Sequence, residues 1–184
     1  MTLTAISRTD YGVLDADPRN RPEEGDKYYN SKLRMEMIYD SHFKKWLSVE
    51  TMTCWFGRNG NTPPETFYRG VNGITAEYIM PYDGTVTGVG FCRYDNDSCI
   101  LEIVDDTTSE SIAALDISTF TQGHFVDSFK KNFEKGSILR IKNAGPDATS
   151  NVQGWFKVRW LSKDRPCSCD AAVLIKKGCQ CGGS

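Results

Sequence analysis

The sequence predicts a mainly β protein whose central part is an antiparallel jelly-roll β-sandwich. Short segments with strand-like patterning recur between residues 51 and 161, and Gly, Pro, Asn and Asp turn signals separate them. The clearest of these segments alternate apolar and polar residues, which is the period of a half-buried strand. Many short strands without long helices are typical of β-sandwiches and jelly rolls.

Residues 1–26 are predicted to form an extended N-terminal arm. Residues 15–25 hold two prolines and many charged side chains, and they show no hydrophobic period. The arm has too few apolar side chains to offset the entropy lost on ordering. We therefore expect it to be ordered only through contact with another chain.

Residues 27–50 are predicted to form a small β-meander. Its strands would cover residues 27–30, 35–39 and 45–49, with a turn at Asp40 and Ser41. A helix over residues 31–46 is the alternative, because Leu33, Met37 and Ile38 are roughly helix-spaced.

Residues 51–161 are predicted to form the jelly-roll β-sandwich. Its strands are expected at residues 52–56, 76–80, 85–94, 99–104, 111–117, 124–129, 137–143 and 153–161. Two of them alternate clearly, so that their apolar residues share one face and their Lys and Arg residues the other. The side chains expected in the interior are Leu101, Ile103, Leu139, Ile141, Phe156 and Val158.

Residues 162–184 form a short Cys-rich C-terminal tail, in which Cys167, Cys169, Cys179 and Cys181 make two Cys-x-Cys pairs. Four thiolates suit tetrahedral Zn²⁺. Interchain disulfides and free thiols are the alternatives. A short helix over residues 171–175, capped by Asp170, would hold the two pairs apart unless Gly178 turns the chain back.

Composition argues against several classes of function. The 184-residue chain is 39% hydrophobic, which is enough for a core, and its formal net charge is −2. That balance disfavours a nucleic-acid scaffold, which needs an excess of Lys and Arg. No apolar run approaches the roughly 20 residues that span a bilayer. The N-terminus does not resemble a signal peptide, so synthesis in a cytoplasm is expected.

No catalytic motif is recognisable, and the protein is predicted not to be an enzyme. His42 and His124 lie outside any nucleophile–base pattern. Residues 57–60 and 70–73 are Gly-rich but lack the Lys-Ser/Thr ending of a phosphate-binding loop, and they are interpreted as turns.

Two acidic clusters could in principle hold Ca²⁺. They are residues 95–97 and the pair Asp105 and Asp106. Neither supplies the full ligand spacing of a calcium loop, so both are interpreted as solvated acids.

Two stretches resemble proteins of tailed bacteriophages. Residues 22–30 (Pro-Glu-Glu-Gly-Asp-Lys-Tyr-Tyr-Asn), followed by Met-Ile-Tyr-Asp at 37–40 and Lys-Trp-Leu-Ser-Val at 45–49, resemble a segment of tail-fibre and other virion proteins. Residues 55–64, 67–73 and 82–90 resemble the start of jelly-roll modules in phage fibre, collar and decoration proteins.

The resemblance implies a non-enzymatic structural component of a tailed-phage virion, either a fibre, a collar or a capsid-decoration subunit. Such a subunit would assemble in the host bacterial cytoplasm with other virion proteins, and a homotrimer is expected. One alternative is a module that binds a host-surface glycan or receptor, with Tyr68, Tyr82 and Tyr94 clustered on a solvent-facing surface. Another is a zinc-dependent adaptor that acts through the tail.

Overall fold

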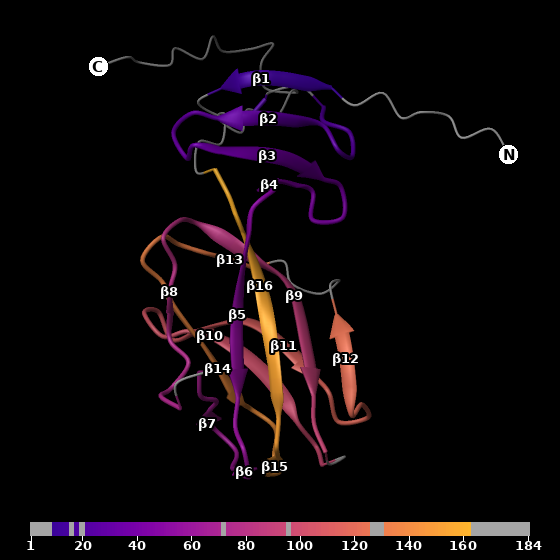
Figure 1. The fold of residues 1–184 in the computed structure, drawn as a ribbon, viewed down its shortest axis with the longest axis vertical. Coiled ribbons are helices and arrows are strands. Elements are labelled where there is room, and N and C mark those ends of the chain that lie inside the picture. The colour runs from indigo at the N-terminus through magenta and orange to yellow at the C-terminus, as the bar shows by residue number, and fades with distance from the viewer. Residues whose placement is uncertain are drawn as a thin grey trace, which may run out of the picture.

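The computed structural model describes residues 9–14, 17–18, 21–70, 73–94, 97–125 and 131–162. Within those ranges the protein is all-β, with strands in several mainly antiparallel sheets. A small N-terminal sheet lies at one end of a larger two-sheet body (Figure 1). None of the described segments forms a helix with the length and hydropathy needed to cross a membrane.

The N-terminal sheet has the strand order β1-β2-β3-β4. Its strands are β1 (Asp10–Leu14), β2 (Lys27–Asn30), β3 (Met35–Asp40) and β4 (Lys45–Ser48). The three strands predicted for the meander are therefore confirmed, and the alternative helix over residues 31–46 is wrong. Arg34 and Lys44 adopt positive φ angles of 58° and 54° in the two connecting turns.

Residues 10–14 of the predicted extended arm form strand β1. It pairs in parallel with β2 within one chain. The carboxylate of Asp26 fastens this pairing, because it accepts hydrogen bonds from the backbone N–H groups of Thr9 and Glu23 at 2.8 and 3.0 Å. The hydrogen bonds of Asp26 therefore help to hold residues 10–14 against β2, although this segment has few apolar side chains. These residues form a strand within one chain.

Trp46 organises the core of the N-terminal sheet. Tyr28, Tyr39 and Tyr11 each set a ring edge-on to its indole, with centroid distances of 5.2, 5.5 and 6.0 Å. Edge-to-face pairs of this kind add to the stabilisation that burial provides. The four aromatic rings thus form much of the core of this small sheet.

The larger body contains two five-stranded sheets, an arrangement consistent with a β-sandwich. One sheet, called the groove sheet below, has the order β12-β9-β16-β5, with β13 paired to β9. Its strands are β5 (Thr51–Gly57), β9 (Gly84–Cys92), β12 (Gln122–Phe125), β13 (Asn132–Phe133) and β16 (Gln153–Trp160).

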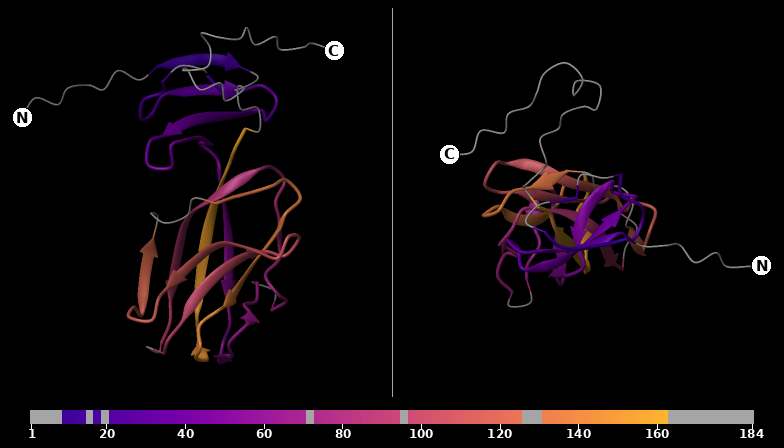
Figure 2. Two further views of the ribbon diagram at one scale, coloured as in Figure 1. Left: turned by 180° about the vertical axis from the view of Figure 1, so that it is seen from behind. Right: turned by 90° about the horizontal axis from the view of Figure 1, so that it is seen from above.

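The opposite sheet has the order β11-β10-β14-β7, with β8 paired to β14. It consists of β7 (Thr66–Phe67), β8 (Tyr78–Ile79), β10 (Ile100–Asp105), β11 (Glu110–Asp116) and β14 (Ile138–Asn143). A two-stranded ribbon of β6 (Asn61–Thr62) and β15 (Thr149–Ser150) lies at the end of the body farthest from the N-terminal sheet (Figures 1 and 2).

The two sheets share one hydrophobic core. All six side chains expected in the interior are at most 2% exposed: Leu101, Ile103, Leu139, Ile141, Phe156 and Val158. Aromatic contacts join the sheets, with the ring of Tyr78 set edge-on to Phe156 at 5.7 Å. The inward faces predicted from the alternation of β14 and β16 are therefore confirmed.

Arg159 connects the N-terminal sheet to the end of β16. Its guanidinium donates hydrogen bonds to the carboxylate of Asp40 at 3.1 Å and to the backbone oxygen of Ser48 at 2.6 Å. The Ser48 hydroxyl in turn accepts a hydrogen bond from the backbone N–H of Trp160 at 2.9 Å. Burial lowers the pKa of Arg159, and the nearby Asp40 carboxylate opposes that shift.

Candidate functional site

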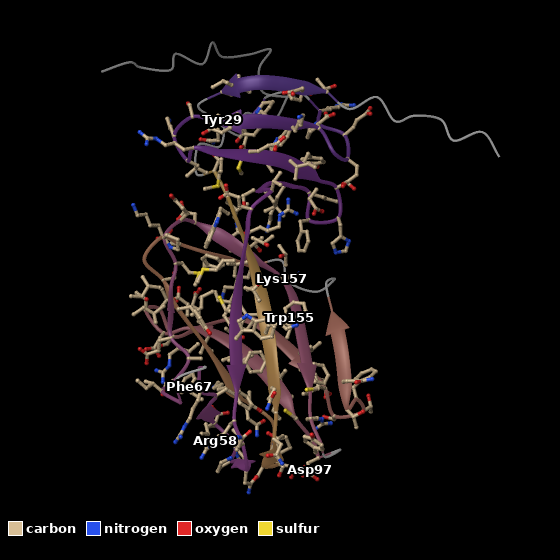
Figure 3. The ribbon with its side chains drawn as sticks, in the orientation of Figure 1. Tyr29, Arg58, Phe67, Asp97, Trp155 and Lys157 are labelled. Carbon is tan, nitrogen blue, oxygen red and sulfur yellow. The ribbon has the colours of Figure 1, made fainter. Side chains whose placement is uncertain are left out.

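A groove of about 880 Å³ lies on the outer face of the groove sheet. Figure 3 labels Trp155 and Lys157 on β16 and shows Arg58 toward the end of the body farthest from the N-terminal sheet. The lining residues used below are Trp55, Gly57, Arg58, Asn59, Arg69, Gly90, Gln153 and Trp155.

Two tryptophans stand side by side in this groove. Trp55 on β5 pairs directly with Trp155 on the central strand β16, and Trp155 pairs on its other side with Gly90 of β9. Residues opposite one another in neighbouring strands project from the same face of a sheet. Trp55 is 54% exposed, so a large part of its indole is open to solvent.

Gly90 makes room for the indole of Trp155. A Cβ atom built on Gly90 would lie 2.5 Å from Cε2 and Cζ2 of that ring, which is too close for any side chain. The indole therefore lies over the backbone of β9. Because Gly90 has no side chain, it acts as a seat for the aromatic ring.

Gly57 at the end of β5 and the loop residues Arg58 and Arg69 line the groove, and these three residues are called the wall below. The backbone groups of Gly57 and Arg69 exchange two hydrogen bonds, of 2.8 and 3.0 Å, which place Arg69 and its bridge partner Thr75 alongside the end of β5. Arg58 follows Gly57 directly, and its own N–H donates to the carbonyl of Val152 at 2.8 Å. This pairing brings Arg58 and Arg69 to the same end of the groove.

The strand that carries Trp55 is held from the opposite sheet. The hydroxyl of Tyr78 donates a hydrogen bond to the backbone carbonyl of Trp55. Desolvation raises the pKa of Tyr78, so the phenol stays protonated and remains a donor. Beneath the groove, burial raises the pKa of Cys54 to about 12, and its thiol is therefore not a nucleophile at neutral pH.

Lys157 lies at the other side of the tryptophan pair. Its Nζ is 5.0 Å from the centroid of the Trp155 ring, within the range of a cation–π interaction. The exposed aromatic surface thus has Lys157 on one side and the two wall arginines on the other.

The four cysteines predicted to bind zinc, Cys167, Cys169, Cys179 and Cys181, lie outside the described residues. Within the described ranges no group of three or more His, Cys, Asp or Glu side chains is arranged to hold a metal ion. His42 is exposed and sets its ring against Phe43 at 5.0 Å. His124 lies on β12, where its backbone pairs with Gly90.

Of the two acidic clusters weighed for Ca²⁺, the pair Asp105 and Asp106 is occupied by protein groups. Residues 95 and 96 of the other cluster lie outside the described residues. Asp105 accepts a hydrogen bond from the Ser137 hydroxyl at 2.5 Å, and Asp106 pairs with Arg140 at 3.0 Å. The two residues therefore serve the opposite sheet, and their interpretation as solvated acids is wrong for Asp105, which is 3% exposed.

The three tyrosines considered for glycan binding do not share a surface. Tyr68 is fully buried, Tyr82 packs against Trp160 at 5.7 Å, and Tyr94 is 87% exposed. A glycan site built on these three side chains is therefore wrong. The aromatic pair on the outward face of the groove sheet is Trp55, which is exposed, and Trp155, which is half-buried.

Sequence reasoning missed the groove residues, although one signal was present. Trp155 belongs to the polar register of β16, together with Gln153, Lys157 and Arg159. A large aromatic residue among polar neighbours on the outward face of a strand breaks the apolar-in, polar-out alternation of the strand. Its partner Trp55 could not be recognised without the strand pairing.

Comparison with known proteins finds no family model that matches the chain and no curated protein that is significantly similar to it.

Proposed function

We propose that this protein is a non-catalytic carbohydrate-binding module, and that its groove receives a sugar chain over Trp55 and Trp155. The observation that carries the proposal is the pair of indoles in register on the outward face of one sheet, with Trp155 seated on Gly90. The pair opens into a groove whose volume is in the range typical of ligand sites.

The chemistry of the groove matches that of a sugar ring. Pyranose rings have an apolar C–H face and a rim of hydroxyl groups. The flat indoles can cover the C–H face, while Arg58, Asn59 and Gln153 offer donors and acceptors to the hydroxyls. Because both tryptophans stand on sheet strands, little conformational entropy is lost when a ligand binds.

Titration with an oligosaccharide panel tests the proposal. We expect the wild-type protein to bind at least one oligosaccharide, with Trp155→Ala weakening that binding tenfold or more, a loss of about 1.4 kcal/mol. Ile79→Ala is the matched control, because Ile79 is 69% exposed but lies on the opposite sheet. Bound oligosaccharides should keep their length, as a non-catalytic module requires.

Equal binding by Trp155→Ala and wild type would contradict the proposal. So would a failure of the wild type to bind any sugar in the panel. A change of oligomeric mass in Trp155→Ala would instead identify the indole as a subunit contact, since tryptophan is also common at protein interfaces.

We propose further that this protein is a jelly-roll module of a tailed-phage virion, in a fibre, collar or decoration subunit. The subunit would form a homotrimer and assemble with other virion proteins. The resemblance of residues 22–49 and 55–90 supports this setting. On the N-terminal sheet, the neighbouring residues Val13 and Tyr29 are 70% and 42% exposed, and a partner subunit would cover them.

Light scattering on the full chain tests the assembly. We expect the mass of a trimer, and Val13→Asp should reduce it toward that of a monomer because a charge would be buried at the contact. A monomeric wild-type protein would contradict the trimer without affecting the sugar-binding proposal.

A further inference from the structure

We infer that the groove selects acidic glycans, whose carboxylates face Arg58 and Arg69 while a sugar ring lies on the tryptophan pair. This inference rests on the proposed carbohydrate-binding function and adds the charge class of the ligand. It is carried by the charge of the groove, by the position of the two arginines and by the contrast with the opposite sheet.

The groove is cationic although the chain as a whole is not. Its described lining contains Arg58 and Arg69 but no aspartate or glutamate, and Lys157 stands beside Trp155. The full chain has a formal net charge of −2. Local positive charge in a concave site attracts anions and strengthens their binding.

On the opposite sheet, by contrast, the cations are paired within the protein. Arg140 contacts Asp106 at 3.0 Å and Glu77 at 3.8 Å, and Lys142 contacts Glu65 and Glu102 at 2.5 and 3.2 Å. Ion pairs within the described ranges include those of Lys27, Lys131, Arg140, Lys142 and Arg159, and neither wall arginine is among these cations. The charge of Arg58 and Arg69 therefore remains available to a ligand.

The two arginines are held where a substituent of a bound sugar would lie. Gly57 precedes Arg58 in the sequence and is the backbone partner of Arg69. The backbones of both arginines are therefore adjacent to Gly57. On the sheet itself Gly57 pairs with Gln153, two residues along the strands from the tryptophan pair. A carboxylate attached to the stacked ring would thus meet a guanidinium, whose planar fork matches its two oxygens.

The decisive experiment compares acidic oligosaccharides with their carboxyl-reduced counterparts. The probes are uronate- and sialate-containing oligosaccharides, each paired with the neutral form of the same linkage and length. We expect at least one acidic member to bind about tenfold more tightly than its reduced partner. Its affinity should also fall as NaCl is raised from about 50 mM to about 500 mM.

Substitutions of the two arginines test whether they cause the preference for acidic probes. Arg58→Gln and Arg69→Gln should each weaken binding of the acidic probe about three- to tenfold, and should change binding of the neutral partner little. Lys135→Gln is the control, because it removes the same charge from an exposed residue near Gly84, at the other end of β9. Arg58→Lys keeps the charge but loses the fork, and should fall between the wild type and Arg58→Gln.

The outcomes separate this inference from the function on which it rests. Equal affinity for acidic and reduced probes, with both lost in Trp155→Ala, would overturn the charge selectivity and leave the sugar site standing. Failure of both probe classes to bind would overturn both proposals. If Arg58→Gln fails to fold, the salt dependence and the reduced probes still decide the question with the wild-type protein.

Discussion

The indole of Trp155 occupies the space that a side chain on Gly90 would need. Two of its ring atoms would lie 2.5 Å from a Cβ atom built there. A glycine on β9 and a tryptophan on β16 therefore form a single unit of the groove, and changing one should displace the other.

Gly90→Ala should push the indole off β9 and weaken sugar binding about tenfold, with a stability loss of about 1–3 kcal/mol from overpacking. Gly84→Ala is a matched control, because its Cβ would lie 2.5 Å from the Phe133 ring, away from the groove. Tryptophan fluorescence and calorimetry measure the two effects. Unchanged sugar binding in Gly90→Ala would show that Gly90 does not orient the indole of Trp155.

Arg159→Met should loosen the N-terminal sheet from the larger body, because the contacts with Asp40 and Ser48 are lost. The expected destabilisation is about 1–3 kcal/mol. A double-mutant cycle with Asp40→Asn measures how strongly the two side chains are coupled. Lys27→Met is the control, since its pairs with Asp10 and Glu36 are exposed and worth little. Zero coupling would contradict the link.

Acid should weaken the attachment of β1. Hydrogen bonds from the backbone of Glu23 and Thr9 hold the pKa of Asp26 below its ordinary value of 3.8. Its contribution to stability is therefore complete above that ordinary value and is lost as the pH falls through the lower folded-state pKa. Asp26→Asn should lower Tm at neutral pH, and its difference from wild type should shrink toward about pH 2. A pH-independent difference would contradict this assignment.

Leu139→Ala should cost about 2–5 kcal/mol, because Leu139 is fully buried and its truncation leaves a cavity between the sheets. Ile79→Ala on the adjacent strand should change stability by no more than about 0.5 kcal/mol, since its side chain is 69% exposed. Denaturant unfolding measures both variants. Similar losses in the two would argue against the shared core.

Cys167, Cys169, Cys179 and Cys181 are expected to act together, either as a zinc site or as covalent links between chains. Replacing Cys179 and Cys181 with Ser should then loosen the assembly and leave the larger body folded. A zinc site would release protons on binding and respond to chelators, whereas disulfides would respond only to reductant. No effect of either treatment would show that the four thiols do not fasten the protein.

Local pattern alone determined the strands of the N-terminal meander and most of those in the larger body. Alternation identified β14 and β16 and placed Leu139, Ile141, Phe156 and Val158 inside, because a strand with one buried face must repeat every two residues. Strand β1 and the two-residue strands β6, β7, β13 and β15 escaped prediction. The two-residue strands are too short to show a period, and β1 depends on the contacts of Asp26.

Only the tertiary structure brings the residues of the groove together. Trp55 and Trp155 are far apart in the sequence, and they become neighbours through the register of β5 against β16. Arg58 and Arg69 meet at the wall because of the backbone pairing between Gly57 and Arg69. Such long-range registers are set by the packing of the whole core, since a slip of one residue would turn every buried side chain outward. A short stretch of sequence can predict a strand, but it does not contain the strand's partner.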